Sequence, residues 1–259
     1  TGTPKGVMVT HGNLLHNERM IEQMFGHTEK TLFVGWLPLF HDMGLIGNVL
    51  QPLYLGIPCV LMSPLAFLQK PLRWLQAISR YGQLDGGKLV TSGGPNFAYD
   101  LCAYKTTPEE RAKLDLSHWR IAFNGSEPVR AETMERFAAA FAVAGFRKEA
   151  FYPCYGLAEG TLLVSGGLQS ALPIVKHVQG SALEENRIVA ASPQEEGAHS
   201  LVGSGRSSVE QQIVIVNPQT LTACRADEIG EVWVAGGSVA HGYWRRAEKT
   251  KETFGAYLE

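Results

Sequence analysis

Cysteine and net charge are both scarce in this chain of 259 residues. Only four cysteines occur, and no two of them form a C-x-x-C pair, which argues against a zinc ribbon or a redox dithiol. We expect buried free thiols in a reducing cytoplasm instead. The 23 Lys and Arg nearly balance the 25 Asp and Glu, so the charge gives no reason to expect binding of nucleic acid or of an anionic membrane surface.

Long apolar runs and a leader segment are also lacking. Gly, Pro or charged residues interrupt the apolar stretches before they reach membrane-spanning length, and the first residues are not a basic segment followed by an apolar run. We therefore expect no stable membrane insertion. The chain starts on Thr1 and stops at Glu259, which we interpret as a piece cut at both ends. Its hydrophobic share of 45% suffices for one large domain or two modest ones.

Two catalytic motifs are missing as well. The sequence has no G-x-S-x-G and no H-E-x-x-H, so it shows neither a serine nucleophile elbow nor a zinc-protease helix. Catalysis here would rest on positioning and electrostatics rather than on a covalent protein nucleophile.

What the first part of the chain does contain is a regular alternation of strand and helix patterns. Apolar runs predict strands at 7–9, 31–37, 59–62, 89–91 and 120–123, and periodicity predicts helices after Thr10 and over 43–55, 71–81, 97–105 and 131–144. This alternation is typical of an α/β fold, a parallel sheet covered by helices. We predict such a subdomain over residues 1–163. A smaller β-rich subdomain over 164–259, with a long loop between 166 and 205, is expected to follow.

The opening stretch TGTPKG has two interpretations. Gly2 and Gly6 let the backbone approach a phosphate closely. Thr1 and Thr3 supply hydroxyls, and Lys5 supplies a point charge. It is not a Walker loop, because Gly6 and a strand pattern follow the lysine instead of Ser or Thr at a helix start. A tight surface turn is the other interpretation, and a motif this short leaves both open.

The stretch WLPLFHDMGLIG places a titratable pair, His41 and Asp42, after an apolar strand and a proline turn. Open α/β sheets bind ligands at the carboxyl ends of their strands, so the pair is a candidate site. In the alternative, Asp42 caps the next helix and His41 packs beside it.

Two glycine-rich turns follow later strand patterns. The residues concerned are Gly93, Gly94, Pro95 and Asn96 in SGGPNFAYDLC, and Gly125, Ser126 and Glu127 in FNGSEPV. A ligand could lie against bare backbone at the first turn, and backbone groups of the second could bind the edge of a base. Plain strand-to-helix turns explain each of them as well.

The stretch FYPCYGLAEG is the most informative single motif. Tyr155 and Gly156 form an aromatic platform beside exposed backbone, and Glu159 lies four residues beyond Tyr155. An acidic residue opposite a phosphate-binding loop suits Mg²⁺, which takes one or two carboxylates together with phosphate oxygens. The alternative is a solvated glutamate at a helix start, favoured by the helix dipole.

Taken in order, TGTPKG, LPLFHDMGLIG, SGGPNFAYDLC, NGSEPV, YGLAE and GEVWVAGGSVAHGYW resemble the adenylate-forming enzyme superfamily. The details FHDMGLIG, GGPNFAYDLC and NGSEPVRAETMERF are most similar to the fatty-acyl-AMP ligases. The resemblance spans nearly the whole chain and implies an AMP-binding domain of a ligase in lipid metabolism. Such ligases react a fatty acid with ATP to give acyl-adenylate and pyrophosphate. They usually pass the acyl group to the phosphopantetheine thiol of an acyl carrier protein.

Residue by residue, the resemblance implies ATP and Mg²⁺ as cofactors and three sets of site residues. The catalytic set is Lys5, His41 and Glu159, with His41 near the acyl carboxylate and Glu159 as the magnesium ligand. The ATP-binding set is Thr1, Gly2, Thr3, Lys5, Gly6, Gly125, Ser126, Glu127, Pro128, Tyr155, Gly156, Leu157 and Ala158. The acyl-binding set is His41, Met43, Ile46, Gly93, Gly94, Pro95 and Asn96.

Three other functions stay open at this point: an acyl-CoA ligase, an inactive acyl- or nucleotide-binding module, and an α/β NTPase that uses water as acceptor. The long stretch between 166 and 205 favours a fatty-acyl-AMP ligase over an acyl-CoA ligase, because fatty-acyl-AMP ligases carry an extra segment there that acyl-CoA ligases lack. In family members, the first half of the phosphate loop precedes the residue that corresponds to Thr1, and a small lid domain follows the residue that corresponds to Glu259. With the C-terminal lid domain absent, we expect little or no turnover from this piece alone.

Overall fold

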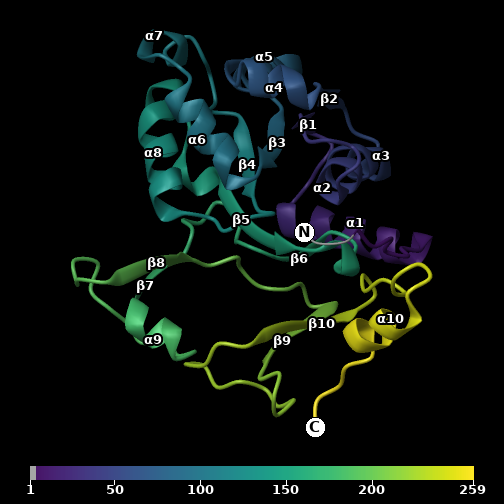
Figure 1. The fold of residues 1–259 in the computed structure, drawn as a ribbon. Coiled ribbons are helices and arrows are strands. Elements are labelled where there is room, and N and C mark those ends of the chain that lie inside the picture. The colour runs from purple at the N-terminus through teal and green to yellow at the C-terminus, as the bar shows by residue number, and fades with distance from the viewer. Residues whose placement is uncertain (1–3) are drawn as a thin grey trace.

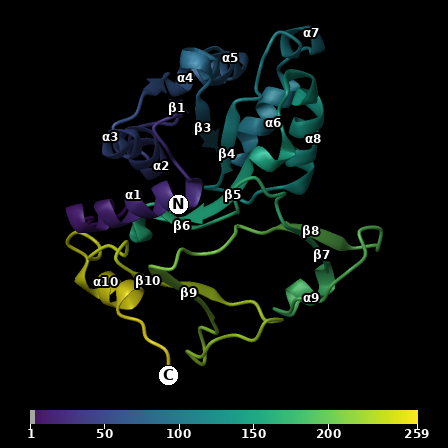
Figure 2. The ribbon, with the colours of Figure 1, turned by 180° about the vertical axis from the view of Figure 1, so that it is seen from behind.

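The computed structural model describes residues 4–259, and its larger part is a six-stranded sheet with helices on both faces (Figures 1 and 2). The strand order is β2-β1-β3-β4-β5-β6; the first five strands run parallel, and β6 pairs antiparallel with β5. The strands are β1 (Thr31–Gly35), β2 (Cys59–Leu61), β3 (Leu89–Gly94), β4 (Trp119–Asn124), β5 (Phe151–Gly156) and β6 (Leu163–Gly166). The predicted α/β class is confirmed, and β6 still belongs to this sheet.

The helices predicted after Thr10 and over 71–81, 97–105 and 131–144 form close to those positions, whereas the short helices at 64–69 and 108–111 were not predicted. Thr10 caps the first helix in a reciprocal capping box with Asn13, and Gly26 ends it in the left-handed region at φ 59°. The helices are α1 (His11–Phe25), α2 (Asp42–Leu45), α3 (Gln51–Leu55), α4 (Pro64–Gln69), α5 (Leu72–Gly82), α6 (Asn96–Tyr104), α7 (Pro108–Arg111) and α8 (Ala131–Phe141). A π-helical turn over Ile46–Leu50 joins α2 to α3. The predicted strand at 7–9 is wrong, since Val7 makes only an isolated bridge to Tyr243.

Successive side chains of one strand bury both faces of the sheet, because strand residues point alternately to opposite sides. Phe151 packs 5.3 Å from Tyr99 of α6 and 5.9 Å from Phe137 of α8, measured between ring centroids. The next residue, Tyr152, packs 4.6 Å from Phe25 of α1. The core is therefore two layers of aromatic and aliphatic side chains, one on each side of the strands.

The second part of the chain is β-rich, as predicted. It contains two antiparallel pairs, β7 (Val175–Gln179) with β8 (Ala198–Val202) and β9 (Gln211–Val216) with β10 (Glu231–Gly236). Two short helices, α9 (Gly180–Glu184) and α10 (Ala247–Phe254), complete it. The stretch from 166 to 205 is thus not the strand-poor loop that we expected. The pattern of β7 is hidden in the sequence because Lys176 and His177 interrupt its apolar residues.

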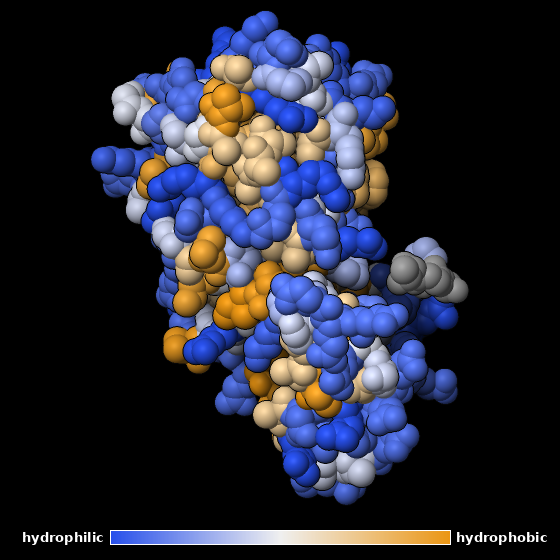
Figure 3. Space-filling view, turned by 90° about the vertical axis from the view of Figure 1, so that its left-hand side faces the viewer, coloured by the Kyte–Doolittle hydropathy of each residue, from blue (hydrophilic) through white to orange (hydrophobic). Residues whose placement is uncertain are grey.

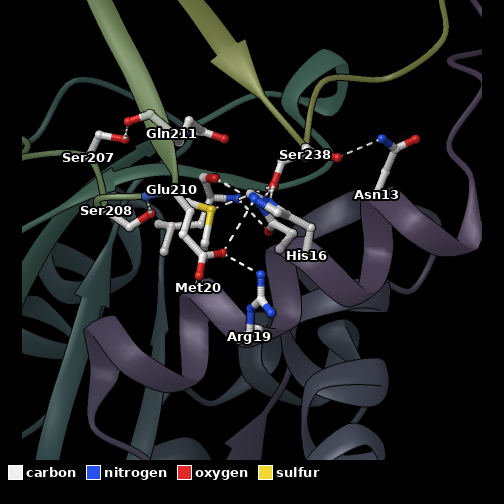
Figure 4. A network of polar contacts seen from close by, with 12 residues as sticks. Asn13, His16, Arg19, Met20, Ser207, Ser208, Glu210, Gln211 and Ser238 are labelled. Atoms are coloured by element: carbon white, nitrogen blue, oxygen red, sulfur yellow. Dashed lines mark hydrogen bonds and ion pairs between the residues drawn. The ribbon is translucent and has the colours of Figure 1, made fainter.

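Helix α1 joins the two parts through a polar network (Figure 4). Asn13 Nδ2 donates to the carbonyl oxygens of Gly237 and Val239 at 2.8 and 2.9 Å. His16 Nδ1 lies 2.7 Å from the hydroxyl of Ser238. Further along the helix, Arg19 and His16 both approach the carboxylate of Glu210. Residues that follow β10 are thereby fixed against the start of the chain.

A buried acid lies on the same helix. Glu18 is 2% exposed, and neither of its carboxylate oxygens has a hydrogen-bond partner within residues 4–259. Helix α1 packs against the π-helical turn and α3, which also hold a buried asparagine and glutamine with one unpaired polar atom each, Asn48 and Gln51. Burial raises the pKa of Glu18 to about 8.

One face of the molecule is mainly polar (Figure 3). On the side of α7, α8 and the β7–β8 pair, hydrophilic side chains predominate and apolar ones form smaller patches (Figure 3). Within the part of the chain that the structure describes, no helix is long and apolar enough to cross a bilayer. All four cysteines, Cys59, Cys102, Cys154 and Cys224, are free thiols.

Candidate active site

The candidate site lies where the parallel strands end. Because β1, β3, β4 and β5 run in the same direction, their carboxyl ends meet at one edge of the sheet, the position at which open α/β folds bind ligands. A cavity of about 270 Å³, here called the central cavity, opens at this edge. Its polar rim comes from segments that follow β1 and β4 and from the end of β5 with the residues after it: His41, Asp42, Gly125, Ser126, Tyr155, Gly156, Leu157 and Ala158.

The inner end of the central cavity is apolar. It is lined by Ile21, Phe25, Phe33, Phe123, Leu162 and Leu163. Cys154 lies beside them, and burial raises the pKa of its thiol to about 12, so the sulfur stays neutral. The cavity therefore combines exposed backbone groups at its mouth with a hydrophobic interior.

A second cavity of about 550 Å³, here called the apolar cavity, lies next to the first. Its lining includes Leu37, Leu65, Leu68, Pro95 and Phe97. Three residues line both cavities, and they form what we call the shared wall: His41, Met43 and Ser126. A ligand at this wall would have a polar rim on one side and a hydrophobic chamber on the other.

His41 is held in the shared wall by its neighbour. As the N-cap of α2, it lies with Nδ1 2.6 Å from Oδ1 of Asp42. The amide of Met43 donates to the same Asp42 oxygen at 2.7 Å and lies further, at 3.2 Å, from His41 Nδ1. We assign the Nδ1 proton to the bond with Asp42, which leaves Nε2 for a ligand. The capping interpretation needs one correction, because His41 and not Asp42 is the N-cap of α2. Both residues line the central cavity, and their role in ligand binding stays a prediction.

The turn after β4 combines strain with support. Ser126 has a φ of 67°, in the left-handed region that side chains other than glycine seldom adopt, and its hydroxyl lies 3.5 Å from the sulfur of Met43. Glu127 does not face the central cavity. Its carboxylate accepts a hydrogen bond of 2.6 Å from the amide of Phe97 in the first turn of α6. That bond ties the turn after β4 to the turn after β3.

Lys5 and Glu159 converge through a residue that the sequence motifs did not identify. The Lys5 Nζ lies 3.3 Å from the hydroxyl of Tyr243 and 4.4 Å from the centre of its ring. The same hydroxyl donates a short hydrogen bond to Oε1 of Glu159. The cation predicted at the start of the chain and the acid predicted far downstream are thus both bonded to one phenol.

Several predicted residues lie away from the cavities. A Cβ atom at Gly93 would lie 2.1 Å from the carbonyl oxygen of Phe123. The close approach of β3 and β4 therefore explains why this residue is glycine. Gly94 packs against Trp36. Asn96 is buried and turns towards α8, donating to the hydroxyl of Thr133 at 3.0 Å.

Of the first glycine-rich turn, only Pro95 is among the lining residues of the described cavities. Other predicted residues also lie outside those linings: Lys5, Ile46, Glu127, Pro128 and Glu159. Gly47 lines the central cavity instead of Ile46. Gly6 accepts a backbone hydrogen bond from Trp244. The predicted ATP contacts of residues 1–3 fall outside the described residues.

The residues at this edge suit a nucleotide that brings its own metal. Backbone groups at Gly125, Ser126 and 155–158 offer donors and acceptors without bulk at the cavity rim. Residues 4–259 contain no group of three or more His, Cys, Asp or Glu that could enclose a metal. A single carboxylate such as Glu159 is nonetheless the usual protein contribution to Mg²⁺ that is bound mainly by phosphate oxygens and water.

The fold is that of an α/β domain with a polar-rimmed cavity at the carboxyl ends of its parallel strands. Residues 1–244 match the family described as "AMP-binding enzyme", and the chain belongs to this family. It is 50% identical over 260 residues to the medium-chain-fatty-acid–[acyl-carrier-protein] ligase JamA of Moorena producens, covering 100% of this chain and 43% of JamA. It is 47% identical to the corresponding ligase TtuA of Teredinibacter turnerae, of which it covers 39%.

Solved structures give the same result. A fatty acid AMP ligase from Legionella pneumophila superposes with a TM-score of 0.93 at 46% identity, over 99% of this chain and 43% of that one. A fatty acyl-adenylate ligase from L. pneumophila, solved in complex with acyl adenylate and pyrophosphate, gives 0.89 at 48% identity, over 96% and 42%. The predicted family resemblance is confirmed. The chain spans less than half the length of these relatives.

Proposed function

We propose that the protein containing this chain activates a fatty acid with ATP, forming acyl-adenylate and releasing pyrophosphate. The observation that carries this proposal is the shared wall, at which His41, Met43 and Ser126 border a polar-rimmed cavity and a hydrophobic one. The reaction needs that arrangement. A carboxylate must meet a nucleotide while its alkyl chain is kept out of water.

At the acyl end, we place the carboxylate at the shared wall and the alkyl chain in the apolar cavity. Each methylene that leaves water there contributes about 0.8 kcal/mol. His41 Nε2, oriented through Asp42, would hold the attacking carboxylate oxygen or the developing charge on the α-phosphorus. Met43, at the boundary of the two cavities, would contact the first carbons of the chain.

At the phosphate end, Lys5 and Glu159 have complementary tasks. The carboxylate oxygen attacks the α-phosphorus, and the bond from that phosphorus to the β-phosphate oxygen breaks, so negative charge moves onto pyrophosphate. Lys5 would offset that charge as a point cation. Glu159 would hold Mg²⁺, which when bound neutralises phosphate charge and orients the triphosphate. Tyr155 and the backbone of Gly156 would contact the adenine ring.

The acceptor of the acyl group is proposed from the relatives. JamA and TtuA are described as ligases of fatty acids to acyl carrier protein, and we propose a carrier-protein thiol as the acceptor here, in the cytoplasm. An acyl-CoA ligase is the second candidate, because the chain is also 36% identical to a putative fatty-acid–CoA ligase, fadD21 of Mycobacterium tuberculosis. Offering either CoA or acyl carrier protein to the full-length enzyme separates the two.

The test uses the full-length protein with ATP and a mixture of fatty acids of different length. Pyrophosphate release and the masses of the acyl-adenylates are measured. Lys5→Ala and Glu159→Ala are each expected to slow release about 10²–10³-fold, the effect of losing one stabilising contact to a developing charge. Lys30→Ala and Glu29→Ala, at exposed positions after α1, are the matched controls.

Two outcomes would contradict the proposal. Unchanged release in both Lys5→Ala and Glu159→Ala would remove the phosphate site from these residues. Release of phosphate or pyrophosphate at the same rate without any fatty acid would identify an NTPase that uses water as acceptor.

A further inference from the structure

Tyr243 occupies the space between the two charged residues of the phosphate end. Its side chain is 3% exposed, its hydroxyl donates to the Glu159 carboxylate, and the Lys5 Nζ lies 3.3 Å from the same oxygen. A phenol can donate one hydrogen bond and accept another at once. Tyr243 therefore satisfies an anion and a cation simultaneously.

The backbone around Tyr243 is hydrogen-bonded to the segment that contains Lys5 and to the segment that contains Glu159. Trp244 donates its amide to the carbonyl of Gly6 at 2.7 Å, one residue beyond Lys5. Ala240 donates its amide to the carbonyl of Glu159 at 2.8 Å. The segment 240–244 thus binds the opening loop on one side and the Glu159 turn on the other.

Helix α10 contacts Tyr243 through a hydrogen bond and through ring packing. The amide of Tyr243 donates to the hydroxyl of Thr250 at 2.9 Å, and its ring packs edge-on against Phe254 at 5.3 Å between centroids. Backbone hydrogen bonds and ring packing therefore fix the position of the Tyr243 hydroxyl.

The chemistry of the site gives this placement a purpose. An ammonium and a carboxylate that paired directly would satisfy each other, and that pair would have to break before either could bind Mg·ATP. A neutral phenol between them keeps each oriented with a weaker partner. We propose that Tyr243 is a positioning residue that holds Lys5 and Glu159 apart and aimed at the triphosphate. This inference rests on the proposed function.

The experiment compares Tyr243→Phe with the wild type in the full-length protein. The change removes the hydroxyl and keeps the ring against Lys5 and Phe254. Mg·ATP binding is titrated calorimetrically without fatty acid, and Mn²⁺ binding in the presence of ATP is followed by electron paramagnetic resonance. We expect Mg·ATP affinity to fall about ten- to hundredfold, as for loss of a hydrogen bond to a charged group, and the KM for Mg·ATP to rise more than kcat falls.

A matched control and the contrary result are available in the same assays. Tyr257→Phe changes a 77% exposed tyrosine and is expected to leave binding unchanged. Wild-type affinities for Mg·ATP and Mn²⁺ in Tyr243→Phe, with an unaltered thermal midpoint, would overturn the inference. Weakened Mg·ATP binding in a protein that forms no acyl-adenylate would instead contradict the proposed function and leave the role of Tyr243 intact.

Discussion

Glu18→Gln is expected to stabilise the protein, and to do so only where the pH is high enough. Burial raises the pKa of Glu18 from 4.5 to about 8. Between these two values the folded chain keeps the proton and the unfolded chain releases it. The unfolded state then binds fewer protons, so the free energy of unfolding falls as the pH rises.

The size of the effect follows from the shift. Each pH unit above 4.5 costs about 1.4 kcal/mol, so the loss is about 3 kcal/mol at pH 7 and approaches about 5 kcal/mol above pH 8. Below pH 4.5 both states hold the proton and the loss vanishes. The glutamine side chain of the variant carries no titrating proton and so escapes this penalty.

The assay is urea unfolding of the full-length protein at a series of pH values, followed by tryptophan fluorescence. Glu18→Gln is expected to gain on the wild type by about 3 kcal/mol at pH 7, equivalent to a thermal midpoint roughly 6–12 °C higher, and to match it near pH 4. Glu29→Gln, at an exposed position, is the control. A difference between Glu18→Gln and wild type that stays constant across this range would refute the reasoning.

Three further changes test other features. Gly156→Ala places a Cβ 2.0 Å from the carbonyl oxygen of Leu162, so it should displace the β5–β6 pair and lower the ATP affinity measured by calorimetry. An unchanged affinity would argue against Gly156 as part of the ATP site. Ser126→Val should lower the thermal midpoint relative to Ser126→Gly, because a branched side chain at φ 67° costs about 1–3 kcal/mol; equal midpoints would exclude strain. Burial lowers the pKa of His27 to about 3, so unfolding free energy should fall as the pH drops below 6.5, and His27→Gln should flatten that slope in urea titrations.

The fold could be predicted from the sequence because its signals are local. The capping pair Thr10 and Asn13, the glycine that ends α1, and apolar runs such as 31–37 each encode one element, and their alternation encodes a parallel sheet. The antiparallel pair of β7 and β8 has no clear sequence pattern, because its burial is partial and Lys176 and the histidines in it mask the strand period. The π-helical turn within 42–55 leaves no sequence pattern distinct from an α-helix.

The candidate site was predicted only in part, for a related reason. Residues that contribute through their backbone or their position at a strand end, such as Gly125 and Tyr155, lie at the central cavity as their motifs suggested. Tyr243 lies within the motif GEVWVAGGSVAHGYW, but a hydrogen bond to a residue 238 positions away has no local signature. Asn96 also follows a strand end, yet its side chain turns to Thr133, a direction that periodicity does not specify.

The separation of Lys5 and Tyr243 by 238 positions also has a consequence for biosynthesis. At roughly 5–20 residues per second, a ribosome needs roughly 10–50 s to translate the stretch between them. During that interval the sheet and its helices can already form on the nascent chain, while Lys5 has no hydrogen bond to Tyr243. The contact between Lys5 and Tyr243 can therefore form only after Tyr243 itself has left the exit tunnel.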